Sequence, residues 1–141
     1  MLVIKDSMVV IHLAKTSLLE QSCHYFGRVL IPELVQQEVV RGEYPETRLI
    51  QELIRNRKII IAAVKDKNLL RRANQFNIQR GEAEVIALYW EQHADLIATD
   101  DDNVRKKKDL LQLKVIGTPA IMLKLYQKRY LDRQKLHVAI K

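Results

Sequence analysis

The amino-acid sequence predicts an α/β fold, a three-layer α/β/α sandwich with a central parallel sheet of about five strands. Short apolar runs without Gly or Pro recur along the chain, as is typical of buried parallel strands. Helical patterns separate these runs, and the connections are short. The 141 residues, 48% of them hydrophobic, suffice for one domain with its own core. We therefore expect a single domain over residues 1–141.

The first strand is expected at residues 2–5, and Asp6 and Ser7 end it. A short apolar helix follows at residues 8–14. Asp6 thus stands just past the carboxyl end of a buried strand, where ligands of open parallel sheets bind. The alternative for Asp6 is a helix cap without further function.

The second helix is expected at residues 16–26, because Ser17 and Glu20 have the spacing of a capping box. A strand at residues 28–31 leads into a helix over residues 32–41, which Pro32 begins and Gly42 stops.

Glu38 lies on or beside the apolar face of that helix, which Leu34, Val35 and Val39 form. A carboxylate is ordinarily costly in such a place. A polar site at the edge of the sheet would explain it, and a Glu that reaches solvent is the alternative.

Residues 45–57 form the next expected helix, with apolar residues at core spacing, and residues 59–64 form the third strand. Asp66 is a suitable N-cap for a basic amphipathic helix over residues 67–76, which carries Arg71 and Arg72.

The central stretch runs from Arg80 to Asp102 and predicts a helix that starts at Gly81 and a buried strand at residues 96–99. Three aspartates, Asp100, Asp101 and Asp102, follow that strand directly. If this strand and the first are neighbours, their terminal carboxylates come together. The alternative is that Asp102 caps the next helix while the other two are solvated.

A helix over residues 104–113 is expected to begin with the basic run Arg105, Lys106, Lys107 and Lys108. Residues 115–116 form the fifth strand, and a last helix runs from about Thr118 to Tyr130 with a basic tail. Since the basic run lies beside Asp101, we expect some of its side chains to contact phosphates of a polyanionic partner.

The net charge of +7, from 24 Lys and Arg against 17 Asp and Glu, makes nucleic acid the leading partner class. Cys23 is the only cysteine and no signal segment opens the chain, so we expect a cytoplasmic protein. No apolar run approaches the roughly 18 residues that span a bilayer.

Several kinds of site are excluded. The four glycines are isolated, which excludes a P-loop and a dinucleotide fingerprint, and the four histidines lack zinc spacing. Carboxylates remain: Asp6, Glu38, Glu82 or Glu84, and Asp100 or Asp101. Oxygen ligands without His or Cys suit Mg²⁺ or Mn²⁺. Glu82 and Glu84 lie about 200° apart on a helix, so they cannot both face one site.

Four segments in series carry a family resemblance: KDSMVVIHLAK, LIPELVQQEVVRG, RGEAEVIALYWEQHADLIATDDD and VIGTPAIMLKLY. In this order and at these intervals they resemble the PIN-domain nucleases, in particular the VapC-like prokaryotic ribonucleases with a G-E-A-E signature. The resemblance extends from Leu2 to about Tyr130.

The resemblance implies a PIN-like sandwich and metal-dependent endoribonuclease activity, often that of the toxin in a toxin–antitoxin pair. It places the catalytic acids at Asp6, Glu38, Glu82 and Asp101, and the Mg²⁺ or Mn²⁺ ligands at Asp6, Glu82 and Asp101, with Asp100 beside them. It assigns supporting hydroxyls to Ser7 and Thr99. A homodimer and a small antitoxin partner are also implied. Met8 departs from relatives, which often have Ser or Asn there, and Glu82 replaces a frequent Asp.

Two other function classes stay open. One is a non-catalytic RNA-binding module of the same fold, although an acid stands at every ligand position. The other is a phosphotransfer protein of similar topology, such as a receiver domain or a phosphatase. The second Asp that these proteins typically need near the first is missing from the segment KDSMVV.

Overall fold

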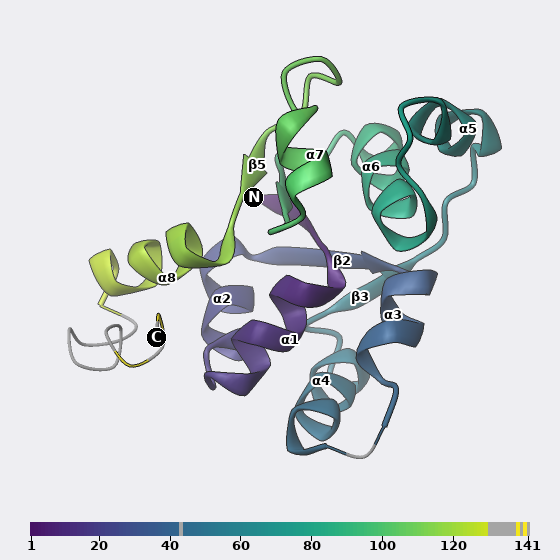
Figure 1. Ribbon diagram of the computed structural model, residues 1–141. Helices are drawn as coiled ribbons and strands as arrows, with labels where there is room; N and C mark the ends of the chain where they lie inside the picture. Colours follow the sequence, from purple (N-terminus) through teal and green to yellow (C-terminus); the bar gives the residue numbers. More distant parts are fainter. Residues whose placement is uncertain (43, 130–137, 139, 141) are drawn as a thin grey trace.

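The computed structural model describes residues 1–42, 44–129, 138 and 140. Within this part of the chain, five parallel strands form one sheet in the order β3-β2-β1-β4-β5 (Figure 1). The strands are β1 (Leu2–Lys5), β2 (Arg28–Pro32), β3 (Ile60–Ala62), β4 (Leu96–Ala98) and β5 (Val115–Ile116). The predicted five-stranded parallel sheet is confirmed.

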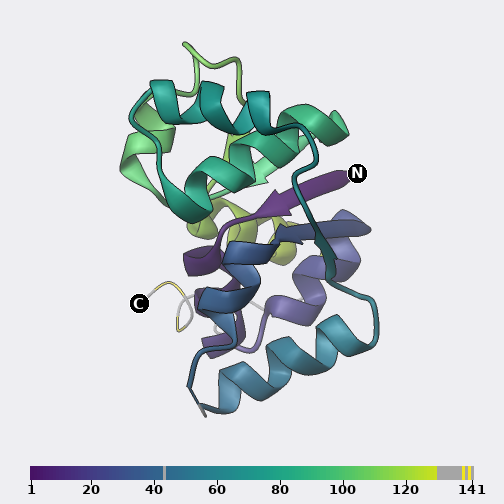
Figure 2. The same ribbon diagram turned by 90° about the vertical axis from the view of Figure 1, so that its right-hand side faces the viewer.

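Helices cover both faces of the sheet. They are α1 (Ser7–Lys15), α2 (Leu19–Phe26), α3 (Glu33–Val39), α4 (Pro45–Arg55), α5 (Lys67–Gln75), α6 (Arg80–Gln92), α7 (Asp102–Lys106) and α8 (Thr118–Gln127). Figure 2 shows α5 and α6 over one face and α1, α2 and α4 over the other. Helix α6 contacts β1, β2 and β4, whereas α8 packs on α1 and α2. These layers are those of the predicted α/β/α sandwich.

The core surrounds β1, the middle strand of the sheet. All four residues of β1 are buried, and Val3 and Ile4 have no exposed surface. Ile86 and Leu88 of α6 are fully buried as well. Each such side chain contributes roughly 1.5–3 kcal/mol through the hydrophobic effect, so the position of β1 is strongly determined. No helix among the described residues is both long and apolar enough to cross a membrane.

The predicted capping box at Ser17 is wrong. Helix α2 begins at Leu19 without a side-chain cap, and Ser17 has the left-handed φ of 61°. Thr16 belongs to the end of α1, where its hydroxyl donates to the carbonyls of His12 and Leu13. The chain reverses at Ser17 because Leu18 and Leu19 both enter the core, where each is fully buried.

The predicted helix over residues 104–113 is also wrong beyond its first turn. Helix α7 ends at Lys106, and residues 107–112 form turns, with Gln112 at a φ of 55°. Leu111 and Leu113 are both buried. In a helix, the side chains of Leu111 and Leu113 would point about 200° from each other, because they are two positions apart. Both reach the core because the chain forms turns here instead. At the other end of the chain, α8 stops at Gln127, and Tyr130 lies outside the described residues.

Candidate active site

Asp6 begins the site, at the carboxyl end of β1. Its amide donates to the carbonyl of Ala98 at 2.9 Å, because β1 pairs with β4 in the sheet. Its side chain is only 3% exposed. The Oδ1 atom accepts hydrogen bonds from the Ser7 amide at 2.6 Å and the Ser7 hydroxyl at 3.3 Å, and Oδ2 accepts from the Thr99 hydroxyl at 2.8 Å. Both expected supporting hydroxyls therefore contact Asp6.

Thr99 connects Asp6 to Asp101. Its hydroxyl donates to Asp6 and accepts from the Asp101 amide at 3.1 Å. The Oδ2 atom of Asp101 then accepts from the Val104 amide at 2.9 Å and caps α7. The N-cap is thus Asp101, and the alternative in which Asp102 caps this helix is wrong. The Oδ1 atom of Asp101 has no hydrogen bond to a described residue.

Asp100 has a different partner. Its Oδ1 accepts from the Thr118 amide at 2.7 Å, and its Oδ2 accepts from the Thr118 hydroxyl at 2.5 Å. These bonds attach the start of α8 to the end of β4. A Cβ at Gly117 would lie 3.0 Å from the Oδ1 atom of Asp100, so a glycine fits there best. Asp100 lines the same pocket as Asp101, but both of its oxygens are already hydrogen-bonded.

Glu82 and Glu84 of α6 have separate roles. Glu84 accepts from the Leu34 amide at 3.1 Å, which satisfies one of the free amides at the start of α3. Glu82 is half-buried and lines the pocket with Asp6 and Asp101. Of the two acids that the sequence left open, Glu82 is the one at the pocket.

Glu38 reaches the site from α3. A Cβ built at Gly81 would lie 2.5 Å from the Oε1 atom of Glu38, so this carboxylate rests against the bare backbone of α6. The side chain is exposed, in contrast to that of Asp6. The structure therefore brings Glu38 beside the residue that precedes Glu82, at the rim of the acidic pocket.

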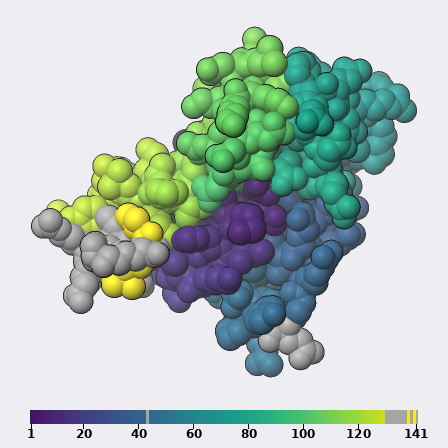
Figure 3. All heavy atoms as spheres, in the orientation of Figure 1, coloured from purple at the N-terminus to yellow at the C-terminus, as the bar shows by residue number. Residues whose placement is uncertain are grey.

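The acidic pocket has a volume of about 440 Å³. Asp6, Glu82, Asp100, Asp101 and Asp102 supply its carboxylates. The surfaces of α1, α3, α6 and α7 adjoin on one face of the molecule, as Figure 3 shows. Four helices that are distant in sequence thus surround the carboxyl end of β1.

The carboxylates of this pocket repel one another. Burial raises the pKa of Asp6, hydrogen bonds from Thr99 and Ser7 partly oppose this rise, and the charge of Asp101 adds to it. Burial raises the pKa of Glu82, and the charges of Asp6, Asp101 and Glu38 raise it further. Burial, then the charge of Asp6, raises the pKa of Glu38. Such mutual repulsion favours a cation or protons in the pocket.

A hydrated divalent ion fits these residues. Among the described residues, no three His, Cys, Asp or Glu side chains lie close enough together to ligate one ion directly. Mg²⁺ usually takes only one or two protein carboxylates and keeps several waters. One or two of Asp6, Glu82 and Asp101 can supply those carboxylate ligands, and the pocket that they line has room for the waters.

Other pocket residues were missed at the sequence level. Met8, His12 and Asn103 line the pocket. The sequence did not single out His12, because the four histidines lack zinc spacing. The spacing of Met8 and His12, four residues apart on one helix, was the available signal. Asn103 carried no signal in the sequence, because it comes to the pocket through its place in the first turn of α7, which Asp101 caps.

The predicted RNA-contacting run divides into two pairs. The Arg105 guanidinium donates to the carbonyl of Thr99 at 3.5 Å, and the Lys107 ammonium donates to the carbonyl of Phe76. Lys106 and Lys108 are exposed. The structure thus leaves Lys106 and Lys108 as the better placed of the four for an external phosphate.

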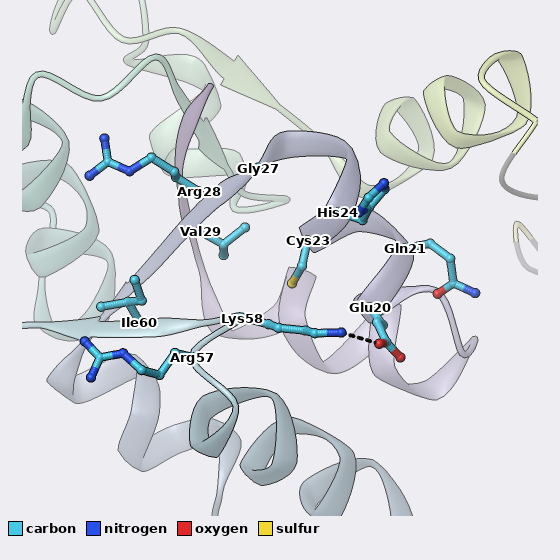
Figure 4. A pocket seen from close by; sticks show the side chains of 10 residues that line it. All are labelled: Glu20, Gln21, Cys23, His24, Gly27, Arg28, Val29, Arg57, Lys58 and Ile60. Atoms are coloured by element: carbon cyan, nitrogen blue, oxygen red, sulfur yellow. Dashed lines mark hydrogen bonds and ion pairs between the residues drawn. The ribbon is translucent and has the colours of Figure 1, made fainter.

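Another pocket lies elsewhere, with a volume of about 780 Å³. It lies at the amino ends of β2 and β3, away from the acidic pocket. Figure 4 shows Arg28 and Arg57 extending from it to one side and the Lys58–Glu20 ion pair, 2.7 Å long, on the other. Its one carboxylate is thus paired, so the pocket has no acidic cluster for a cation.

A comparison with models of protein families shows to which family the chain belongs. A model described as a PIN domain, DUF3368, matches residues 2–141. The chain belongs to the PIN-domain family. Comparisons with curated proteins and with solved structures find no significant match. PIN domains have a nuclease-like fold and are generally nucleases, which typically use divalent metal ions on nucleic acid. The acidic pocket of this PIN domain is where such chemistry is expected.

Proposed function

We propose that this PIN domain is a Mg²⁺- or Mn²⁺-dependent endoribonuclease of the VapC-like branch. One observation carries the proposal: Asp6, Glu82 and Asp101 come from three separate segments and line one pocket at the carboxyl edge of the sheet. Glu38 stands at the rim of this pocket. The same four acids are those that the family resemblance assigned.

Asp6 is the fixed member of the set, because Ser7 and Thr99 hold both of its oxygens. Glu82 and Asp101 would also bind the ion, directly or through its waters. Glu38 would contact it directly or through water. Asp100 is the weakest candidate ligand, since Thr118 already occupies both of its oxygens. The bound ion would supply an activated water and neutralise charge on the phosphate under attack.

RNA binding is proposed for the basic surface beside the acids. Lys106 and Lys108 are exposed at the end of α7, the helix that Asp101 caps, and just beyond it. The net charge of +7 favours a polyanion over other partners. Arg105 and Lys107 would contribute less, because their side chains already donate to backbone carbonyls.

The test replaces single acids in the full chain. Asp6→Asn, Glu82→Gln and Asp101→Asn should each lower RNA cleavage by at least about 100-fold while the protein stays folded. The wild type should gain thermal stability from Mn²⁺, because the ion relieves the repulsion among the carboxylates. Each variant should lose most of that gain, since it lacks one charge. Cleavage assays and melting temperatures with and without Mn²⁺ measure both effects.

Asp102→Asn is the matched control, because Asp102 is an exposed neighbour that lines the same pocket. It should keep cleavage within about threefold of wild type. Full activity of Asp6→Asn, or wild-type cleavage that persists in EDTA, would refute the metal mechanism. RNA binding without any cleavage would favour the non-catalytic module instead.

A further inference from the structure

A second, smaller pocket lies on the other side of Glu38. Its volume is about 90 Å³, and Gln37, Glu38, Arg41, Arg80 and Gly81 are among the residues that line it. Since a water molecule takes about 30 Å³ in the liquid, the space holds about three waters. It is too small for a nucleobase and suits a compact group such as a phosphate.

The charge of this small pocket favours an anion. Arg41 and Arg80 supply two positive charges to the lining, against the one carboxylate of Glu38. Among the described residues, neither arginine has a carboxylate within 4 Å, and the one ion pair at that distance is Lys58–Glu20. Both arginines nevertheless act on Glu38, because their charges lower its pKa against the effect of burial. No salt bridge to a described residue therefore occupies the guanidinium donors of Arg41 and Arg80.

Arg80 also has an unusual backbone. It has a φ of 53°, in the left-handed region, although it is not a glycine and stands at the first residue of α6. Such a conformation costs an ordinary side chain about 1–2 kcal/mol. The 13-residue helix α6 begins here without a side-chain cap, so its positive dipole end adds to the two guanidinium charges.

We propose that Arg41 and Arg80 bind a backbone phosphate of the RNA, next to the phosphate at the acidic pocket. This inference rests on the proposed ribonuclease function and adds a substrate contact to it. Glu38 and Gly81 line the small pocket, and Glu82 follows in the chain and lines the acidic one. A strand that crosses Glu38 therefore meets the carboxylates on one side and the arginines on the other. Guanidinium groups suit this role because they bind phosphate oxygens in pairs.

The experiment measures binding of a short single-stranded RNA to the full chain with Asp6→Asn, so that cleavage does not interfere. In this background, Arg41→Gln and Arg80→Gly should each weaken binding about tenfold, as expected for the loss of one charge-assisted contact. The slope of log affinity against log salt should fall by about 0.7 for each lost contact. Arg80→Gly should also melt at or above the parent temperature, because Gly accepts the left-handed backbone. A binding loss in that variant is then no folding defect.

Arg28→Gln and Arg57→Gly are matched controls in the large pocket at the opposite edge of the sheet. Arg57 has a φ of 61°, so its replacement by Gly makes the same backbone change as at Arg80. The controls should leave RNA affinity within about twofold of the parent. Equal losses at both edges, or unchanged affinity and salt slope in the Arg41 and Arg80 variants, would overturn the phosphate site. RNA binding without cleavage by the wild type would overturn the nuclease proposal alone, and no RNA binding would overturn both.

Discussion

Gly81 is the residue on which the position of Glu38 depends. A Cβ at this position would lie 2.5 Å from the Oε1 atom of Glu38 and 3.7 Å from a methyl group of Val35. The carboxylate is the mobile end of a flexible side chain and is the group that must move. A single methyl group can therefore displace one acid of the site while the fold is retained.

Gly81→Ala should lower RNA cleavage about tenfold and leave the melting temperature within about 3 °C of wild type. Alanine favours a helix by about 1 kcal/mol over glycine, which offsets the cost of moving Glu38. Cleavage and thermal unfolding of Gly81→Ala and Glu38→Gln should be compared. If Gly81→Ala cleaves like wild type while Glu38→Gln is impaired, the contact with Gly81 does not position Glu38.

Lys5 is a buried charge that no sequence pattern pointed to. It precedes Asp6, has no exposed surface, and its ammonium donates to the Ser22 hydroxyl. Burial lowers the pKa of Lys5 from 10.5 to about 8, against a raising effect of Cys23. The ring of Phe26 lies 5.5 Å from the ammonium and gives it limited compensation. Lys5 therefore destabilises the folded state when it is charged.

The sign of the pH effect follows from this lowered pKa. Below pH 8 the lysine is charged in both states, and a pKa of about 8 in place of 10.5 corresponds to roughly 3 kcal/mol of lost stability. Between pH 8 and 10.5 the folded protein releases this proton first, so the penalty disappears as the pH rises.

Lys5→Met should raise the melting temperature at pH 7 by at least about 3 °C, and the difference from wild type should shrink as the pH rises above 8. Ser22 stays satisfied in this variant, because its hydroxyl donates to the carbonyl of Leu19 at 2.7 Å. Thermal unfolding of both proteins from pH 6 to 10 makes the comparison. A lower melting temperature for Lys5→Met, or a difference that does not vary with pH, would contradict this account.

At the scale of elements, the ends of β1 and β4 assemble the acidic pocket. The register pairs Lys5 with Ala98, so Asp6 and Thr99 follow at equivalent positions of neighbouring strands. The chain then turns from β4 into α7, which places Asp101 toward the pocket and leaves Asp100 to hold the start of α8. The adjacent residues Asp100 and Asp101 thus accept hydrogen bonds from the starts of two different helices, α8 and α7.

Asp100→Ala should destabilise the protein by about 1–2 kcal/mol, because the amide and hydroxyl of Thr118 lose their acceptors. The expected drop in melting temperature is about 3–8 °C. Because Asp101 stays in place, the variant should keep most of the stabilisation by Mn²⁺. Asp102→Ala is the control, since the exposed Asp102 accepts no side-chain hydrogen bond from a described residue. Its melting temperature should change by less than about 2 °C. If Asp100→Ala abolishes the Mn²⁺ effect, Asp100 is a ligand as the family resemblance suggested.

At the scale of the whole molecule, we expect a homodimer with a small antitoxin as partner. Leu123, 47% exposed, and Tyr126, 36% exposed, lie three residues apart on the outer side of α8 and are available for a protein contact. Leu49 and Leu53, in contrast, pack on or in the core. Light scattering at micromolar concentration should therefore report twice the chain mass of 16.5 kDa.

Leu123→Glu should shift this mass toward the monomer, whereas Lys124→Glu, an exposed neighbour on α8, should not. A monomer at micromolar concentration in the wild type would refute the dimer. A small protein that co-purifies from the native host would support the antitoxin, and repeated purification without one would count against it.

Most of the fold was predictable because local periodicity and burial agree in this chain. Each of the five strands comes from a short, mostly apolar run, and the order of helices and strands follows the pattern. Strand β1 is buried throughout, whereas β3 at the edge of the sheet keeps Ile60 39% exposed. The errors at Ser17 and at residues 107–112 share one cause. In both places, two nearby leucines must reach the core, and this tertiary requirement overrides a local helical signal.

The acids that follow the buried strands could be identified from the sequence, since the end of a strand is a local feature of the chain. The role of each acid could not, because it depends on the hydrogen-bond donors that tertiary packing brings to the carboxylate. Asp100 and Asp101 are adjacent, yet one accepts from Thr118 and the other caps α7. Lys5 and the pair Arg41 and Arg80 gave no signal in the sequence, because the burial of Lys5 and the proximity of the two exposed arginines arise from segments distant in the chain.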